Sequence, residues 1–278
     1  MRPIGIFDSG VGGLSVLRSL RALLPAEVLL YLADQAHVPY GQRPLEQVRQ
    51  FSEQITRYLL GEGAKLIVVA CNTASAAALQ HLRMVFPRVH FVGMEPAVKP
   101  AAEQTRSGVV GVLATPATFQ GALYASVVER FANGVTLLQS TCPGLVEQIE
   151  AGDLDGPVTR GILEAALGPM LAKGIDTVVL GCTHYPFVIP LIEQITGPEV
   201  RVIDPAPAVA RQVARLLDEH GLRTPEGNEP GLMRFATTGD RQVMKAALLR
   251  LFGEERQVEE VRWVGGEIKP LNHKGHKG

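Results

Sequence analysis

The chain has 278 residues, of which 46% are hydrophobic and 20% are charged, and its formal net charge is −1 at pH 7. This length favours two domains of ordinary size, and the near-neutral charge gives no reason to expect a nucleic acid or a membrane as partner. Three cysteines without Cys-x-x-Cys spacing, and no apolar run typical of a signal peptide or a membrane span, predict free thiols in a cytoplasmic protein.

Short β-branched runs alternate with amphipathic helical patterns through the first hundred residues. Leucines at positions 14, 17, 20 and 24, for example, have the spacing of a helix that buries one face. Alternation of this kind predicts an α/β fold with a mostly parallel sheet that helices cover on both faces. Strands are expected at 2–7, 27–34, 64–70 and 89–95, and helices at 13–25, 45–63 and 75–86.

The second half of the chain repeats this order. The offset from Gly63 to Gly174 is 111 residues, and that from Cys71 to Cys182 is also 111. Two equivalent α/β units with a cleft between them explain the repeat economically. The corresponding segments of the second half are 108–118, 135–141, 159–174, 175–181 and 200–206.

The segment from about residue 209 to residue 270 has no partner in the repeat. It is expected to add a helix and two strands, in "LMRFATT" and "QVEEVRWVG", to one domain. We therefore predict two pseudo-symmetric, doubly wound α/β domains with the active site in the cleft between them. The first consists of residues 1–97 plus 208–270 and the second of residues 98–207, while the polar residues 271–278 are predicted to be disordered.

Two cysteines stand at equivalent points of the repeat, Cys71 after "KLIVVA" and Cys182 after "DTVVLG". Ligands of open α/β sheets bind beyond the carboxyl ends of the strands, so a unit that faces its twin places both thiols in one cleft. One thiolate can then remove a proton from a carbon of a small substrate while the opposite thiol returns one, which inverts the stereocentre without a cofactor. Both cysteines precede a predicted helix, and His184 is near Cys182; either feature lowers the pKa of a thiol.

Each thiol also has a structural interpretation as a small buried hydrophobe. That interpretation is favoured for Cys142, which has no thiol counterpart in the repeat. The shared register of Cys71 and Cys182, and their polar neighbours, favour a functional role for those two. A zinc site formed by this pair with His184 is a further alternative, but no short ligand-pair spacing supports it. No metal and no cofactor are predicted.

Other strand ends carry polar groups suited to an amino acid. Asp8 and Ser9 end the first strand, ahead of glycines whose N–H groups could bind a carboxylate, and a loop offers Tyr40 and the amide of Gly41. Structural alternatives remain, because Asp8 and Ser9 could cap the helix and Tyr40 could be an exposed loop aromatic. Three further polar residues adjoin the thiols: Asn72, Thr73 and Thr183.

Five motifs together closely resemble those of bacterial glutamate racemases, in the aspartate/glutamate racemase superfamily. They are "GIFDSGVGGLSVL", "ADQAHVPYGQR", "VVACNTASA", "GVLATPAT" and "LGCTHYPF", and the resemblance runs in the same order to about residue 206. It implies a cofactor-independent enzyme that interconverts L- and D-glutamate, supplies D-glutamate for peptidoglycan, and is commonly a homodimer.

The resemblance also implies roles for individual residues. Cys71 and Cys182 would be the two catalytic acid/bases. Asp8, His184 and a glutamate would be auxiliary groups; "CPGLVEQIEAG" offers Glu147 and Glu150, of which Glu150 fits the family better. The residues implied to bind the substrate are Asp8, Ser9, Tyr40, Gly41, Asn72, Thr73, Thr183 and His184.

Three other functions are weighed against this one. An aspartate racemase would use the same thiols on a shorter substrate. A dinucleotide-binding protein is suggested by "GVGGLS" and Asp34, but Ser15 replaces the third glycine and Asp8 would repel a diphosphate. A non-catalytic thiol sensor on the same fold would be expected to lack one of the paired cysteines, and both are present.

Overall fold

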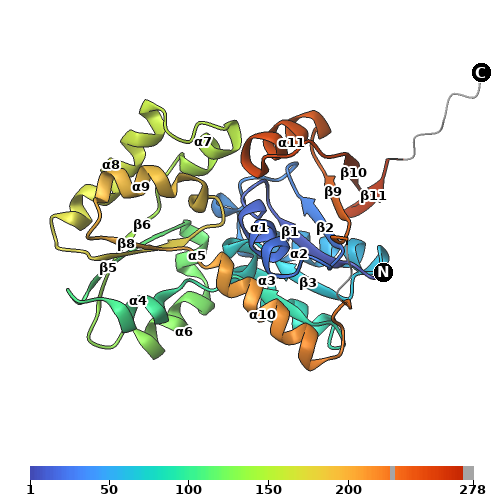
Figure 1. Ribbon diagram of the computed structural model, residues 1–278, viewed down its shortest axis with the longest axis horizontal. Coiled ribbons are helices and arrows are strands. Elements are labelled where there is room, and N and C mark those ends of the chain that lie inside the picture. Colours follow the sequence, from blue (N-terminus) through green and yellow to red (C-terminus); the bar gives the residue numbers. More distant parts are fainter. Residues whose placement is uncertain (226–228, 272–278) are drawn as a thin grey trace, which may run out of the picture.

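The computed structural model describes residues 1–225 and 229–271, which form two lobes side by side (Figure 1). Each lobe has its own sheet with helices on both faces. Residues 271–278 were predicted to be disordered, and all of them except Leu271 lie outside the described residues. The N–H of Leu271 donates to the Glu260 carbonyl at 3.3 Å. No helix within the described parts of the chain is long and apolar enough to cross a membrane.

The first lobe is built on a seven-stranded sheet with the order β11-β10-β9-β2-β1-β3-β4. All neighbouring strands are parallel except the antiparallel pair β10–β11. Most of these strands are short, buried, β-branched runs, which is typical of parallel strands covered on both faces. They are β1 (Ile4–Asp8), β2 (Leu29–Ala33), β3 (Leu66–Val69), β4 (Phe91–Gly93), β9 (Met233–Thr237), β10 (Val258–Val264) and β11 (Glu267–Pro270).

Alternate residues of β1 point into two different cores. Ile4 and Ile6 pack with helices on one face of the sheet, and Phe7 packs with helices on the other. The first face is covered by α1 (Leu14–Leu23), α10 (Ala206–Glu219), α11 (Arg241–Ala247) and the π-helical turn η3 (Leu248–Phe252). The second is covered by α2 (Leu45–Gly61) and α3 (Asn72–Val85), and the short 3-10 helix η1 (Tyr40–Gln42) precedes α2.

The second lobe has a four-stranded, fully parallel sheet with the order β6-β5-β7-β8. Its strands are β5 (Val109–Ala114), β6 (Thr136–Ser140), β7 (Thr177–Gly181) and β8 (Arg201–Ile203). One face carries α7 (Leu145–Ala151), α8 (Pro157–Leu171), η2 (Tyr185–Val188) and α9 (Ile189–Thr196). The other carries α4 (Val98–Gln104) and α6 (Ala122–Phe131), with α5 (Pro116–Gln120) just before α6.

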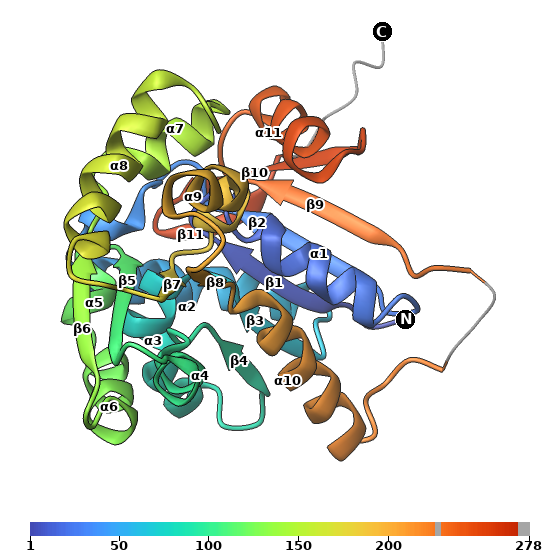
Figure 2. The same cartoon turned by 60° about the vertical axis from the view of Figure 1, so that its left-hand side comes forward.

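The strand order confirms the α/β fold with an internal repeat. Strands β6-β5-β7-β8 have the same order as β2-β1-β3-β4 and are parallel in the same way. Cys71 and Cys182 therefore follow equivalent strands, β3 and β7. Figure 2 shows how the last part of the chain, from β9 onward, extends the first sheet beside β2. This unit has no equivalent in the second lobe.

Several local features differ from the prediction, among them the helix α11, which was not expected in the last segment. Cys71 caps α3, with its sulfur accepting the N–H of Ala74 at 3.5 Å, but Cys182 is followed only by η2, before α9. Pro186 and Pro190 cause the difference, because proline has no N–H for a continuous helix. The hairpin strand β11 was also not predicted, although Gly265 and Gly266, both with positive φ, form the kind of turn that joins two antiparallel strands.

The chain crosses between the lobes twice, after β4 and after β8. Val98 already belongs to the core of the second lobe, and Ala206 belongs to that of the first. These positions support domain boundaries near residues 97 and 207, which remain a prediction.

Gly161 offers a test of how α8 is packed. It lies in the interior of this helix, and no atom lies within 4 Å of the position that its Cβ would take. We expect Gly161→Ala to raise the free energy of unfolding by about 0.5–1 kcal/mol, because alanine loses less backbone entropy than glycine in a helix. Urea unfolding of both proteins measures the change, and a lower stability would show that α8 does not tolerate the methyl group.

Candidate active site

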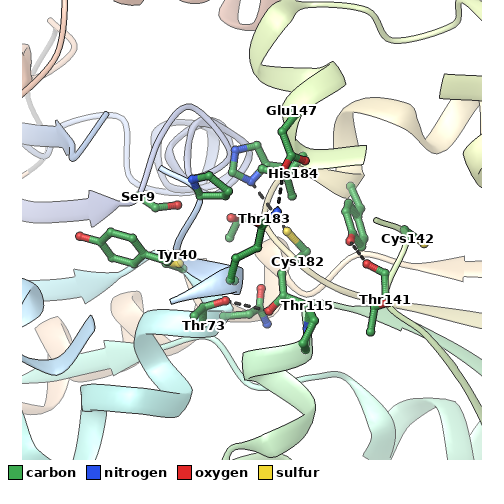
Figure 3. Close-up of a pocket in the computed structure, with 18 of the residues that line it drawn as sticks. Ser9, Tyr40, Thr73, Thr115, Thr141, Cys142, Glu147, Cys182, Thr183 and His184 are labelled. Carbon is green, nitrogen blue, oxygen red and sulfur yellow. Dashed lines mark hydrogen bonds between the residues drawn. The ribbon is translucent and has the colours of Figure 1, made fainter. Parts of the chain in front are cut away.

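A cavity of about 290 Å³ lies between the two lobes, beyond the carboxyl ends of the strands (Figure 3). This is the position that the sequence predicted for the active site. Its volume is near the lower end, about 300 Å³, of the range for ligand pockets, which suits a small substrate. Every predicted site residue except Asp8 and Glu150 lines it: Ser9, Tyr40, Gly41, Cys71, Asn72, Thr73, Cys182, Thr183 and His184.

The two predicted catalytic cysteines reach this cavity from different lobes. Cys71 is 5% exposed and comes from the first lobe, and Cys182 is 6% exposed and comes from the second. Both are free thiols. The arrangement gives the cavity one sulfur from each half of the repeat.

Cys71 lies in an environment that disfavours its negative charge. Burial raises the pKa of the Cys71 thiol well above its usual value, and the neighbouring carboxylate of Asp8 raises it further. The N–H of Ala74 opposes both effects without cancelling them. The raised pKa favours the neutral thiol of Cys71 at physiological pH.

Asp8 lies behind the cavity wall and is fully buried. Its two carboxylate oxygens accept the N–H groups of Ser9 and Gly13, both at 2.7 Å, and Thr183 Oγ1 donates to it at 3.3 Å. Burial raises the pKa of Asp8, although the charge of His184 and hydrogen bonds with Cys71, Gly13 and Ser9 act in the opposite direction. Asp8 therefore joins the loop after β1 to both Cys71 and the second lobe.

A hydrogen-bonded chain leads away from Cys182. His184 Nδ1 lies 3.7 Å from Cys182 Sγ, and His184 Nε2 lies 2.6 Å from Glu150 Oε1. Burial lowers the pKa of His184, but hydrogen bonds and charges from Cys182 and Glu150 outweigh burial and raise it well above its usual value. For Glu150, burial raises the pKa, and the hydrogen bond and charge of His184 bring it below its usual value. His184 is thus a cation that donates through both ring nitrogens.

The glycine-rich loop after β1 leaves room between the lobes for the hydrogen-bonded side chains of Cys182, His184 and Glu150. The N–H of Val11 donates to Glu150 Oε1 at 2.8 Å. A Cβ on Gly10 would lie 1.9 Å from Glu150 Oε1, and one on Gly12 would lie 2.4 Å from His184 Nδ1. Only glycine allows such close approach at these positions.

Two N–H groups of the same loop already have protein partners. The N–H groups of Val11 and Gly13 donate to the side chains of Glu150 and Asp8, so neither is free to bind a substrate carboxylate.

The two candidate glutamates have different hydrogen-bond partners. Glu150 holds His184, whereas Glu147 lines the cavity and accepts a hydrogen bond from Gln42 Nε2 at 2.9 Å. This geometry supports Glu150 as the auxiliary acid and places Glu147 at a contact between the lobes.

Tyr40 and Asn72 line the cavity in different ways. Tyr40 is only 1% exposed, so the alternative of an exposed loop aromatic is wrong, and its hydroxyl points away from the cavity to donate to Asp34 at 2.6 Å (Figure 3). Its ring, not its hydroxyl, forms the cavity wall. Asn72 is buried, and both polar atoms of its side chain have no hydrogen-bond partner among the described residues. Buried polar atoms are rarely left unpaired, so Asn72 is suited to a polar ligand.

Several lining residues were not predicted as site residues. Thr115 follows β5 as Ser9 follows β1, so the repeat itself could have identified it; its Oγ1 lies 2.8 Å from Thr73 Oγ1 across the cleft. Cys142, for which a structural role was favoured, lines the cavity with a positive φ of 43°, and burial raises its pKa to about 12. The others are Pro39, Gln42, Pro116, Thr141, Pro143, Gly144, Val146 and Tyr185.

The zinc alternative gains no support from the geometry. Within residues 1–225 and 229–271, no group of three or more histidine, cysteine, aspartate or glutamate side chains is placed to hold a metal ion. The fold and the cavity together define a two-lobed α/β enzyme whose small-molecule site receives a thiol from each lobe.

Comparison with known proteins identifies the family. The Asp/Glu/Hydantoin racemase family matches residues 4–213. A glutamate racemase of Roseiflexus sp. (strain RS-1) is 53% identical over 250 residues, which are 90% of this chain and 92% of that protein. The chain belongs to the Asp/Glu/Hydantoin racemase family and is an amino-acid racemase. The resemblance seen in the five motifs is thereby confirmed.

Two solved structures are similar over nearly the whole chain. Glutamate racemase from Thermus thermophilus, in complex with β-chloro-D-alanine, is 41% identical with a TM-score of 0.79. Glutamate racemase from Francisella tularensis subsp. tularensis SCHU S4, in complex with D-glutamate, is 30% identical with a TM-score of 0.82. Each comparison covers 94% of this chain and 97% of the other.

Proposed function

We propose that the enzyme interconverts L- and D-glutamate by proton transfer at Cα between Cys71 and Cys182, without a cofactor. The observation that carries this proposal is the pair of thiols, which stand at equivalent points of a repeat and line one cavity. The similarity to glutamate racemases, one of them bound to D-glutamate, supports glutamate as the substrate.

The first proton transfer follows from the charges around Cys182. With a cationic His184 beside its sulfur, Cys182 serves as the thiolate and takes the proton from the Cα–H bond that faces it. The bonding electrons remain on Cα and spread into the adjacent carboxylate. The neutral thiol of Cys71 then gives its proton to the other face of Cα. The product has the opposite configuration, with Cys182 protonated and Cys71 ionised.

The reverse direction needs Cys71 as the base. The neighbouring Asp8 has a pKa that burial raises toward the range of the thiol, so a proton can pass from Cys71 to Asp8 at lower cost. Each direction therefore uses a different auxiliary group, Asp8 for Cys71 and His184 for Cys182.

The remaining polar residues of the cavity are proposed to hold the substrate. The amide of Asn72, which has no partner among the described residues, can bind a carboxylate, and the amide of Gly41 is a second neutral donor. Tyr40 contributes its ring to the wall. The proposed ligands of the substrate's carboxylates and ammonium group are Ser9, Gly41, Asn72, Thr73, Thr183 and His184, while Asp8, behind the cavity wall, acts on Cys71.

Glu150→Gln tests the charge of His184. The carboxylate of Glu150 helps to raise the pKa of His184, so the neutral amide should lower that pKa and His184 should lose its proton at a lower pH. We expect the alkaline limb of the kcat–pH profile to move to lower pH, in the direction that uses Cys182 as the base. The opposite direction serves as the internal control, and equal shifts in both directions would contradict this role.

Substrate choice is tested by incubating the purified protein with D-glutamate and with D-aspartate, without added cofactor, and following both isomers by chiral chromatography. Formation of L-glutamate with the higher kcat/KM supports the proposal. Faster conversion of aspartate would change the assignment to an aspartate racemase. Conversion of neither amino acid would reject both substrates.

We further propose that the product supplies D-glutamate for peptidoglycan synthesis in the cytoplasm and that the enzyme is a homodimer. Three buried free cysteines are consistent with a reducing compartment. Growth of a D-glutamate-requiring bacterium that expresses this chain tests the first statement, and light scattering of the purified protein tests the second.

A further inference from the structure

We propose that Trp263 and Asp34 are positioning residues of this active site: they hold Tyr40, and with it one wall of the cavity, in the geometry that proton transfer needs. The inference rests on the proposed function. It makes the C-terminal strands, which have no counterpart in the second lobe, part of the catalytic apparatus.

Asp34 collects four hydrogen bonds in a fully buried position. One carboxylate oxygen accepts from the hydroxyl of Tyr40 at 2.6 Å and lies 2.9 Å from His37 Nδ1. The other accepts from Trp263 Nε1 and from Thr238 Oγ1, both at 2.7 Å. One oxygen therefore holds the loop that carries Tyr40, and the other is anchored to the C-terminal unit.

Trp263 also packs against the loop through its ring. Its ring centroid lies 5.1 Å from that of His37 and 5.5 Å from that of Phe51. His37 is stacked on Phe51 at 3.9 Å, and the Tyr40 ring lies 5.8 Å from Phe51. The indole thus fixes the loop by an aromatic cluster as well as by a hydrogen bond to a buried charge.

A second connection runs from the C-terminal unit toward the other catalytic thiol. Thr237 Oγ1 donates to the side-chain oxygen of Gln35 at 2.8 Å. For Glu150, burial raises the pKa, while hydrogen bonds from His184 and Gln35 lower it. The loop that begins at Asp34 is therefore connected to Tyr40 on one side and to the Glu150–His184 chain on the other.

The position of Asp34 in the repeat supports a role in the site. Asp34 directly follows β2, and the strand register makes Cys142, which lines the cavity itself, its equivalent after β6. The first lobe thus has a buried carboxylate where the second has a wall residue. A carboxylate surrounded by four donors holds its neighbours more tightly than neutral partners would.

The first test is Trp263→Phe, which keeps an aromatic ring and removes the N–H. We expect kcat for glutamate to fall about tenfold with little change in KM, because a displaced wall misaligns Cα between the sulfurs without removing a group that binds substrate. Arg262→Lys is the matched control, since Arg262 is exposed on the same strand and pairs with Glu260. It should keep the wild-type kcat.

The second test uses the fact that Trp263 is the only tryptophan of the chain. Its fluorescence should change on addition of D-glutamate, with a midpoint near KM. A ligand that contacts Tyr40 shifts this side chain, and the hydrogen bonds through Asp34 pass the shift on to the indole. In Tyr40→Phe, which lacks the linking hydroxyl, this change at saturation should be lost. A residue with only a structural role would lower the melting temperature without producing this coupling.

The outcomes are distinct. An active wild type with a slow Trp263→Phe variant and a ligand-dependent emission supports the inference. Two results with an active wild type overturn the inference. One is a Trp263→Phe variant that keeps kcat within about twofold of the wild type. The other is wild-type fluorescence that does not change at saturating D-glutamate. An inactive wild type contradicts the proposed function instead, and the same assay shows which of these holds.

Discussion

Cys71→Ser and Cys182→Ser should each reduce racemisation of glutamate about a thousandfold or more, in both directions. Every turnover needs one thiolate to accept the proton of Cα and one thiol to supply the new one. A serine hydroxyl has nearly the size of the thiol but does not ionise near neutral pH, so it fails in either role. Chiral chromatography of D- and L-glutamate reactions with the purified variants measures the loss.

Cys142→Ser is the matched control for both variants. It makes the same chemical change at a third thiol that lines the cavity, and serine can keep the positive φ of this position as well as cysteine does. Because no proton transfer is assigned to Cys142, its serine variant should keep activity within about tenfold of the wild type. A Cys71 or Cys182 variant that is as active as the Cys142 variant would contradict the two-thiol mechanism.

The second large effect is expected from Gly12→Ala. The new methyl group would lie 2.4 Å from His184 Nδ1 and 2.7 Å from Thr183 Oγ1, so the side chains of both residues would have to move. His184 would then lose its alignment with Cys182. A displacement of about 1 Å in a catalytic group costs about a hundredfold in rate, and we expect kcat to fall at least that far.

Gly161→Ala is the control for this substitution, because it adds the same methyl group in open space. Its activity should equal that of the wild type. Circular dichroism and the melting temperature of Gly12→Ala show whether the protein remains folded. A folded Gly12→Ala enzyme with wild-type kcat would show that His184 does not need the position it has in the structure.

Much of the fold was predictable from the sequence because the chain repeats itself. Strands at equivalent positions, each ending in polar residues, place Cys71 and Cys182 at the same edge of two sheets. Local patterns suffice for such features, since the burial of a strand and the residues at its end are both encoded within about ten positions. The same repeat could have located Thr115.

Other features depend on partners far apart in the sequence. The hydroxyl of Tyr40 points to Asp34 because Trp263 and Thr238, more than 200 residues away, anchor that carboxylate. Likewise, the N–H of Val11 in the glycine loop donates to Glu150 because the second lobe brings that side chain to it. No local pattern contains this information, so the direction of these side chains could not be predicted.

The most direct test of the two-thiol mechanism is the early course of the D-glutamate reaction in deuterated water. Thiols exchange their protons with solvent, so the cysteine that donates to Cα carries deuterium before the reaction begins. The two-thiol mechanism predicts that the first L-glutamate formed contains deuterium at Cα while the remaining D-glutamate stays unlabelled. L-Glutamate that keeps the original hydrogen, or D-glutamate labelled as fast as the product, would mean that a single base serves both faces.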